Sequence, residues 1–268
     1  MNKQIGSRVI TAVVGIPLLV WIIGWGRPAH FLLLVFLLTI VALWEYFSMA
    51  FRGRWKKQAL GVLFGVLAAL SVILPGSLQP GLGLAGVVVL AFLSYLFSGA
   101  GLEERYQQLG WTLVGALYVG FLVPHLFLLY RSHDGREWVF FILLVIMAGD
   151  TAGYFVGSSL GKKKLYPEIS PGKTVEGAFA SLAASALAGV VGGKYLLPTF
   201  PWMEILLISL FLSLLGQGGD LFESWIKRVF AVKDSGHLLP GHGGLLDRMD
   251  SLIFPVVFAT YYLRLIHP

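Results

Sequence analysis

The sequence contains no cysteine among its 268 residues. This absence excludes a disulfide framework, a thiolate metal site and a cysteine nucleophile. Charged residues are also scarce, at 13% of the chain, whereas an ordinary soluble domain has about 25%. Because so few charges cannot cover a folded surface in water, the composition argues against a soluble globular protein.

Apolar residues are abundant instead, at 57% of the chain, and the mean hydropathy is +0.79. A helix that crosses a bilayer needs about 20 mostly apolar residues. The apolar runs are continuous and lack the alternating pattern of barrel strands, so helix is the expected state. We therefore expect an all-α, polytopic integral membrane protein with nine transmembrane helices, at approximately 8–26, 30–50, 59–75, 82–98, 109–130, 138–158, 175–197, 204–220 and 250–266.

The N-terminal run superficially resembles a signal peptide, because Lys3 and Arg8 precede apolar residues from Val9 onward. The run continues to about Trp25, however, and no small-residue cleavage site follows it. We therefore interpret residues 8–26 as the first membrane span.

The distribution of basic residues predicts the orientation of these spans, because cytoplasmic loops are enriched in Lys and Arg. With the N-terminus inside and nine spans, 15 of the 20 Lys and Arg residues fall on the inner side. The five on the outer side are Arg27, Arg131, Arg136, Lys194 and Arg264. We expect a cytoplasmic N-terminus and a C-terminus outside. The net charge of +6 then needs no nucleic acid to explain it.

The polar chemistry is concentrated in the C-terminal half. Residues 1–137 contain few ionisable groups outside short loops, with Glu45, Glu103 and Glu104 as the acidic exceptions. No internal repeat or low-complexity linker divides the chain. We expect a single membrane domain over 1–268, with N-terminal helical spans in 1–137 and the catalytic half in 138–268.

Two sets of glycines have the four-residue spacing that lets helices approach closely in lipid. They are Gly61 and Gly65, and Gly153, Gly157 and Gly161. Helix packing is the expected role, and the same spacing favours a homodimer.

Asp150 lies inside an otherwise apolar run. A charge at such a position is costly, and it usually faces a polar cavity or a partner. Lining the active site is the preferred interpretation, and a purely structural role as an interhelical hydrogen-bond acceptor is the alternative.

In the loop that follows, residues 161–177, most of the lysines are explained by the enrichment of basic residues on the inner side or by attraction to anionic headgroups. Only Lys173, between Ser170 and Thr174, looks placed for a specific phosphate.

The densest polar cluster runs from Gly216 to Asp250. Its hard oxygen ligands are Asp220, Glu223, Asp234, Asp247 and Asp250, and its cations are Lys227, Arg228, Lys233 and Arg248, with His237 and His242 nearby. Carboxylates mixed with cations around a glycine-rich loop suit a site for Mg²⁺ and a polyphosphate. Zinc is disfavoured, since there is no cysteine and no His pair at helical spacing. The alternative is a solvated loop in which Asp250 caps the last helix.

Within this cluster, the spacing of the polar residues resembles the signature of the phosphatidate cytidylyltransferases, also called CDP-diglyceride synthases. The matching positions span 27 consecutive residues and are Ser224, Lys227-Arg228, Lys233-Asp234, Gly236, Pro240, His242-Gly243-Gly244 and Asp247-Arg248-x-Asp250. Further likeness lies in Asp150 to Tyr154, Ser170 to Gly177 and Gly216 to Asp220. The resemblance is strong over about 140–255. Gly172 departs from the second lysine of many relatives, and Gly153 from a frequent alanine.

The resemblance implies that CTP and phosphatidic acid give CDP-diacylglycerol and pyrophosphate. It implies a bacterial-type inner membrane protein whose active site faces the cytoplasm. The expected catalytic residues are Asp220, Asp247, Lys227, Arg228 and Arg248. The expected substrate-binding residues are Asp150, Ser170, Lys173, Thr174, Lys233, Asp234, His242, Gly243 and Gly244, although a structural turn is an equal reading of His242. We expect Mg²⁺, as two ions, on Asp220 and Asp247, with Asp150, Glu223 and Asp250 as weaker ligand candidates.

Two other functions remain to be compared with this one. An ion or solute transporter would also use acidic residues within helices, but here the ionisable residues gather toward one surface and no inverted repeat is visible. A CDP-alcohol phosphotransferase consumes the same lipid nucleotide, but its Asp-x-x-Asp-Gly motif is absent.

Overall fold

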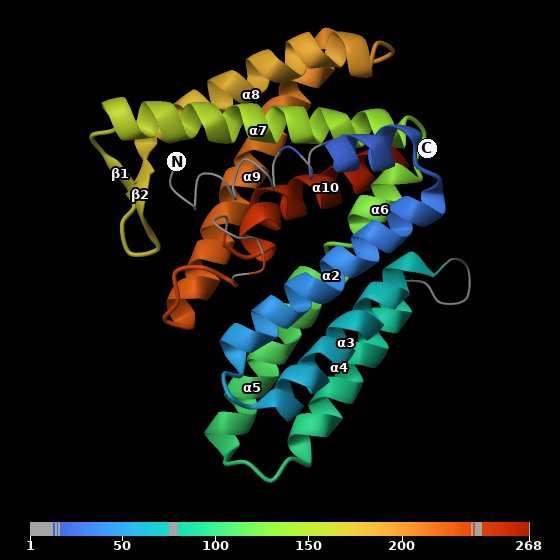
Figure 1. Ribbon diagram of the computed structural model, residues 1–268, viewed down its shortest axis with the longest axis vertical. Coiled ribbons are helices and arrows are strands. Elements are labelled where there is room, and N and C mark those ends of the chain that lie inside the picture. Colours follow the sequence, from blue (N-terminus) through green and yellow to red (C-terminus); the bar gives the residue numbers. More distant parts are fainter. Residues whose placement is uncertain are drawn as a thin grey trace. The chain divides into compact units, whose positions relative to one another are not determined.

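The computed structural model describes residues 13, 15, 17–74, 80–236, 238 and 243–267. The chain divides into two compact units (Figure 1). Unit 1 comprises Met1–Leu128 and Asp234–Leu246, and unit 2 comprises Leu129–Lys233 and Asp247–Pro268. The segment Asp234–Leu246 therefore belongs structurally with helices that precede it by more than a hundred residues in sequence.

Unit 1 is a group of helices packed side by side (Figure 1). They are α2 (Pro28–Ala50), α3 (Trp55–Ile73), α4 (Pro80–Leu96), α5 (Leu102–Gly115) and the π-helix η1 (Ala116–Phe121). A Cβ atom at Gly61 would lie 2.5 Å from the ring of Phe47, and one at Gly65 would clash with Leu43. The predicted close packing at these two glycines is confirmed, and it joins α3 to α2 within one chain.

Unit 2 contains α7 (Gly135–Leu160), α8 (Val175–Leu196), α9 (Trp202–Val229) and α10 (Leu246–Ile266), and the short α6 (His125–Tyr130) crosses the boundary of the units. Helices α7 and α8 run side by side (Figure 1). A Cβ atom at Gly177 would lie 2.8 Å from the carbonyl oxygen of Gly153, and one at Gly157 would lie 3.1 Å from Thr174 Oγ1. The second glycine set therefore also serves packing within the chain.

A short antiparallel hairpin joins α7 to α8. Its strands are β1 (Lys164–Tyr166) and β2 (Ser170–Thr174), paired at Lys164 with Thr174 and at Tyr166 with Ser170. We expected an irregular loop here. The hairpin is a small departure from an otherwise helical architecture. Because Lys173 lies on β2, the pairing of the two strands sets the direction of its side chain.

Within the described residues, seven helical segments are long and apolar enough to cross a membrane. They are Pro28–Ala50, Trp55–Ile73, Leu102–Tyr130, Gly135–Leu160, Val175–Leu196, Trp202–Val229 and Leu246–Ile266. The expected span 82–98 corresponds to the shorter apolar helix Gly81–Leu96. Part of the expected span 8–26 lies outside the described residues, and residues 17–25 within it are helical. The all-α polytopic architecture is thus supported, whereas the count of nine and the orientation of the termini stay predictions.

Two helix ends differ from the prediction in a way that matters for the site. Helix α9 continues to Val229, nine residues beyond the expected end at 220, and α10 begins at Leu246 rather than at 250. The expected loop is therefore shorter. Its acidic and basic residues at either end lie on helices.

Candidate active site

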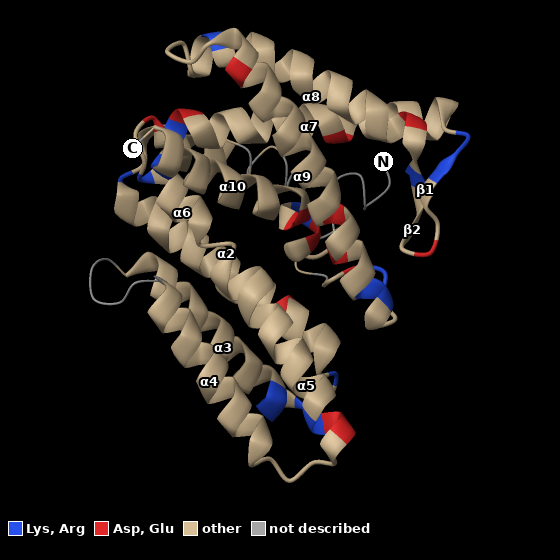
Figure 2. Ribbon diagram, turned by 180° about the vertical axis from the view of Figure 1, so that it is seen from behind, with Lys and Arg blue, Asp and Glu red and all other residues tan. Residues whose placement is uncertain are grey.

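The second half of α9 presents a polar face. Asp220, Glu223, Ser224 and Lys227 have the spacing i, i+3, i+4 and i+7, which places all four on one side of a helix. Acidic and basic residues gather along this part of α9 (Figure 2). Ser224 Oγ donates a weak hydrogen bond of 3.4 Å to Asp220 Oδ1 along this face.

The deepest part of the polar face is a buried triad of charges. Lys227 Nζ forms an ion pair with Glu223 and lies 2.7 Å from Asp247 Oδ1 on α10. The side chains of Lys227, Glu223 and Asp247 are 12%, 0% and 10% exposed. One ammonium group therefore offsets two buried carboxylates, and the cluster retains an excess of negative charge that suits an additional cation.

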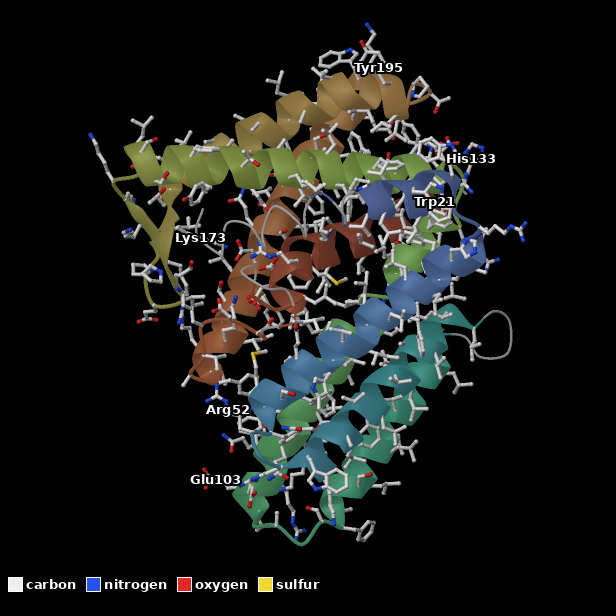
Figure 3. All side chains as sticks on the ribbon, viewed as in Figure 1. Trp21, Arg52, Glu103, His133, Lys173 and Tyr195 are labelled. Carbon is white, nitrogen blue, oxygen red and sulfur yellow. The ribbon has the colours of Figure 1, made fainter. Side chains whose placement is uncertain are left out.

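A second ion pair lies nearer the surface. Lys173 Nζ is 2.7 Å from Asp220 Oδ2, and both side chains are partly exposed. Lys173 extends from the hairpin toward α9 (Figure 3). Since this ammonium is held by an accessible carboxylate, a phosphate ligand can exchange for the carboxylate without dismantling the core.

Asp150 on α7 is linked to the start of α10. Ser251 Oγ donates to Asp150 Oδ2 at 3.2 Å, while the backbone N–H of Ser251 donates to Asp250 Oδ1 at 2.7 Å. Asp150 also lies within the electrostatic field of Lys173 and Asp220. Asp150 is therefore an interhelical hydrogen-bond acceptor that also borders the charged cluster formed by Lys173, Asp220, Glu223, Lys227 and Asp247. A structural role and a place in the lining of the active site are thus compatible for this residue.

The alternative interpretation, in which Asp250 caps the last helix, is wrong. Helix α10 begins at Leu246, so Asp250 lies inside its first turns. Its carboxylate is buried and is close enough to Asp220 for the two to repel each other. A helix cap is satisfied by backbone N–H groups and needs no such acidic neighbour, so Asp250 belongs with the charged cluster.

Glycines bring α9 and α10 into close contact at the cluster. A Cβ atom at Gly219 would collide with the backbone oxygen of Asp250, and one at Gly216 would lie 3.1 Å from that of Ser251. At Gly218 a Cβ atom would meet open space. The glycines at 216 and 219 thus allow the acidic residues of the two helices to face each other.

This packing makes a testable prediction. We expect Gly219→Ala to lower the free energy of unfolding by about 1–3 kcal/mol, because the added methyl group must displace backbone on α10. Gly218→Ala is the matched control and is expected to be neutral or stabilising by up to about 1 kcal/mol, since alanine favours helix. Thermal unfolding in detergent measures both, and equal effects of the two substitutions would contradict the packing.

Two residues expected to bind substrate or act in catalysis have structural partners. Thr174 is buried, and its Oγ1 accepts a hydrogen bond from Gly177 N at 3.1 Å, which caps the N-terminus of α8. Arg228 Nε donates to the carbonyl oxygen of Ile169 at 3.0 Å and so ties α9 to the hairpin turn. Ser170 lies at the start of β2 and is partly buried. Direct substrate contacts of these residues stay predictions.

The remaining expected residues lie around the loop between α9 and α10. Lys233 and Asp234 are exposed, as is Arg248 on α10. Asp234, Gly243 and Gly244 belong to unit 1. Gly243 has a φ of 79°, a conformation that glycine adopts without strain. His242 lies outside the described residues.

The donor chemistry of the cluster fits a hard cation. Among the described residues, no three His, Asp or Glu side chains converge as a protein-only metal centre. Mg²⁺, however, is commonly held by one or two carboxylates together with substrate phosphates. Asp220 and Asp247 each face a lysine ammonium, and the fully buried Glu223 is paired with Lys227. The arrangement is therefore compatible with Mg²⁺ shared between protein and a phosphate ligand.

Sequence reasoning missed Ser251, whose side chain and backbone link Asp150 to Asp250. The available signal was its position four residues after Asp247, on the same helical face.

Comparison with known proteins gives a consistent result. The model of the cytidylyltransferase family matches residues 6–266. A phosphatidate cytidylyltransferase of Bacillus subtilis (strain 168) is 35% identical over 97% of both chains. One of Staphylococcus epidermidis is 33% identical over 92% of this chain and 94% of the relative, and one of Brucella suis biovar 1 is 34% identical over 94% and 90%. The match extends through both units, and the chain belongs to the cytidylyltransferase family.

Proposed function

We propose that the chain is an enzyme that converts CTP and phosphatidate to CDP-diacylglycerol and pyrophosphate. The observation that carries this proposal is the interleaving of lysines and carboxylates where β2, α9 and α10 meet, with Lys173 on Asp220 and Lys227 on Asp247. Proteins that are similar to this chain over nearly its whole length are phosphatidate cytidylyltransferases. A membrane-embedded chain with a polyphosphate-binding cluster suits a reaction between a charged nucleotide and a lipid headgroup.

The proposed reaction is a direct displacement. An oxygen of the lipid phosphate attacks the α-phosphorus of CTP and forms a new P–O bond, while the bond from that phosphorus to the β-phosphate oxygen breaks and pyrophosphate leaves. The attacking phosphate is already ionised near neutral pH, so no dedicated general base is required. Positioning and charge neutralisation then supply most of the acceleration.

The lysines supply the neutralising charge. Lys173 lies at the exposed edge of the cluster and Lys227 in its interior, so they suit contacts with different phosphates of the nucleotide. Arg248, Lys233 and Arg228 add positive charge at the surface. Fixed cations aimed at the developing charge stabilise the transition state more than a mobile solvent does.

Asp220 and Asp247 are the proposed Mg²⁺ ligands, with Glu223 and Asp250 as further candidates for a second ion. The repulsion among these carboxylates supports the assignment, because four acids face two lysines in the cluster. When bound, Mg²⁺ would polarise phosphate oxygens and orient the triphosphate.

The proposed site faces the cytoplasm, where CTP is available. The predicted topology of nine spans with a cytoplasmic N-terminus supports this orientation, because it places most of the basic residues on the inner side. We further propose one membrane domain in a bacterial-type inner membrane. A homodimer remains part of the proposal, although the glycines that suggested it pack within the chain.

The proposal is tested by product analysis with purified protein. Labelled CTP, phosphatidic acid and Mg²⁺ are supplied together and then omitted one at a time. We expect CDP-diacylglycerol and pyrophosphate in equal amounts, and only in the complete mixture. A transporter would form neither product, and a CDP-alcohol phosphotransferase would consume CDP-diacylglycerol rather than make it.

A further inference from the structure

One buried acid lies outside the charged cluster of unit 2. Glu45 is on α2, inside a membrane-spanning helix, and is only 6% exposed. An acidic side chain within a span is costly unless partners compensate it, and such residues usually serve function. Neither the catalytic cluster nor the packing of α2 on α3 accounts for it.

Among the described residues, the hydrogen-bond partners of Glu45 come from the segment Asp234–Leu246 of unit 1. The backbone N–H of Leu245 donates to Glu45 Oε1 at 2.9 Å, and that of Leu246 donates to Oε2 at 2.9 Å. Ser235 Oγ donates to Oε2 at 3.2 Å. One carboxylate therefore binds the chain at two points about ten residues apart.

The glycines of this segment are explained by the same carboxylate. A Cβ atom at Gly236 would lie 2.6 Å from Glu45 Oε1, and one at Gly244 would lie 2.7 Å from Glu45 Oε2. Any larger residue at either position would push the carboxylate away. Both glycines fall within the 224–250 signature, so these two positions of the signature make room for the Glu45 carboxylate.

The contacts also complete the start of a helix. Leu246 is the first residue of α10, and the first N–H groups of a helix have no partner inside it. A negative charge at that end is favourable. Glu45 thus acts as an N-terminal cap supplied by another helix, and the next residue in the chain is Asp247, the proposed metal ligand.

From these contacts we propose that Glu45 is a positioning residue for cytidylyl transfer. It fixes both ends of the segment that carries Asp234, Gly243 and Gly244, and it fixes the backbone from which Asp247 follows. In this proposal Glu45 acts through these backbone contacts and not on the substrate itself. Its effect on catalysis rests on the proposed function, whereas its effect on the segment does not.

The substitution that separates charge from shape is Glu45→Gln. Glutamine has one acceptor oxygen where the carboxylate has two, and its amide nitrogen would face an N–H donor. We expect kcat to fall roughly 10- to 100-fold, as for a misplacement of about 1 Å at an active site, with the KM for CTP changed much less. Thr39→Val is the control, because Thr39 is buried on the same helix and its hydroxyl donates to Val35 O within that helix.

Amide hydrogen exchange tests the anchor without substrate. We expect the amides of Leu245 and Leu246 to exchange at least about tenfold faster in Glu45→Gln, since their acceptors are weakened. Glu45→Asp keeps the charge on a shorter side chain and should be intermediate in both kcat and exchange. If Glu45→Gln does not fold, Glu45→Asp tests the positioning role on its own. We then expect a lower kcat and faster exchange of the Leu245 and Leu246 amides than in the wild-type protein.

The outcomes distinguish a failure of the proposed function from a failure of the positioning role of Glu45. A wild-type protein without cytidylyl transfer would overturn the proposed function, while faster exchange in the variants would still support the anchor. An active wild type whose Glu45 variants keep both kcat and the exchange rates of Leu245 and Leu246 would overturn the positioning role. Loss of kcat in Thr39→Val equal to that in Glu45→Gln would also overturn it.

Discussion

Asp247→Asn is expected to reduce cytidylyl transfer on the order of 100- to 1000-fold, the range seen when one charge-stabilising group is removed from an active site. Asparagine preserves the shape of the side chain but not its charge. Asp247 is only 10% exposed and lies 2.7 Å from Lys227, so water cannot substitute for the lost carboxylate. The measurement is turnover of labelled CTP by folded protein in detergent at saturating Mg²⁺.

Glu168→Gln is the control for this substitution, because Glu168 is an exposed acid in the hairpin turn of the same unit. It is expected to leave turnover unchanged. An Asp247→Asn protein that turns over CTP at the wild-type rate at saturating Mg²⁺ would remove Asp247 from the proposed catalytic residues.

The sequence predicted the helices well wherever apolar residues run continuously. It failed at the end of α9, because a hydropathy rule ends a span at its first charges. In the structure Asp220, Glu223 and Lys227 share one helical face and form ion pairs, Asp220 with Lys173 and Glu223 with Lys227, while apolar residues continue on the remaining faces. Phe222 and Trp225 contact each other edge to face, and Ile226 is buried. A helical pattern of polar residues at 220, 223, 224 and 227 was the signal that could have extended the helix.

The hairpin was missed for a different reason. Strand β2 reads Ser-Pro-Gly-Lys-Thr, and proline and glycine are poor strand formers. Its pairing with β1 depends on the ends of α7 and α8 being held together, which is a tertiary effect. The identities of the residues in the charged cluster could be predicted from the signature, but their pairings could not.

The role of Glu45 was beyond reach of a single sequence. The sequence marked it as an exception among apolar residues, but its hydrogen-bond partners lie 190 to 201 residues away. No periodicity relates positions so distant. Burial and hydrogen-bond geometry were needed to connect the acid on α2 with the glycines of the signature.

Lys227→Met is expected to destabilise the folded protein as well as inactivate it. Lys227 is the ammonium partner of both Glu223, which is fully buried, and Asp247. Methionine preserves most of the side-chain volume but leaves two buried carboxylates without their cation. Breaking a buried ion pair by removing one partner costs about 3–5 kcal/mol of the free energy of unfolding. Denaturant or thermal unfolding in detergent measures the loss.

The double variant Glu223→Gln with Lys227→Met separates stability from catalysis. Removing the buried carboxylate together with its partner relieves most of the electrostatic penalty, so we expect stability to recover while cytidylyl transfer stays absent. Lys194→Met, at an exposed lysine on α8, should change stability by no more than about 0.5 kcal/mol. If the double variant is no more stable than Lys227→Met alone, the cost does not come from the uncompensated charge of Glu223. If Lys227→Met keeps wild-type turnover, that lysine has no part in holding the phosphates.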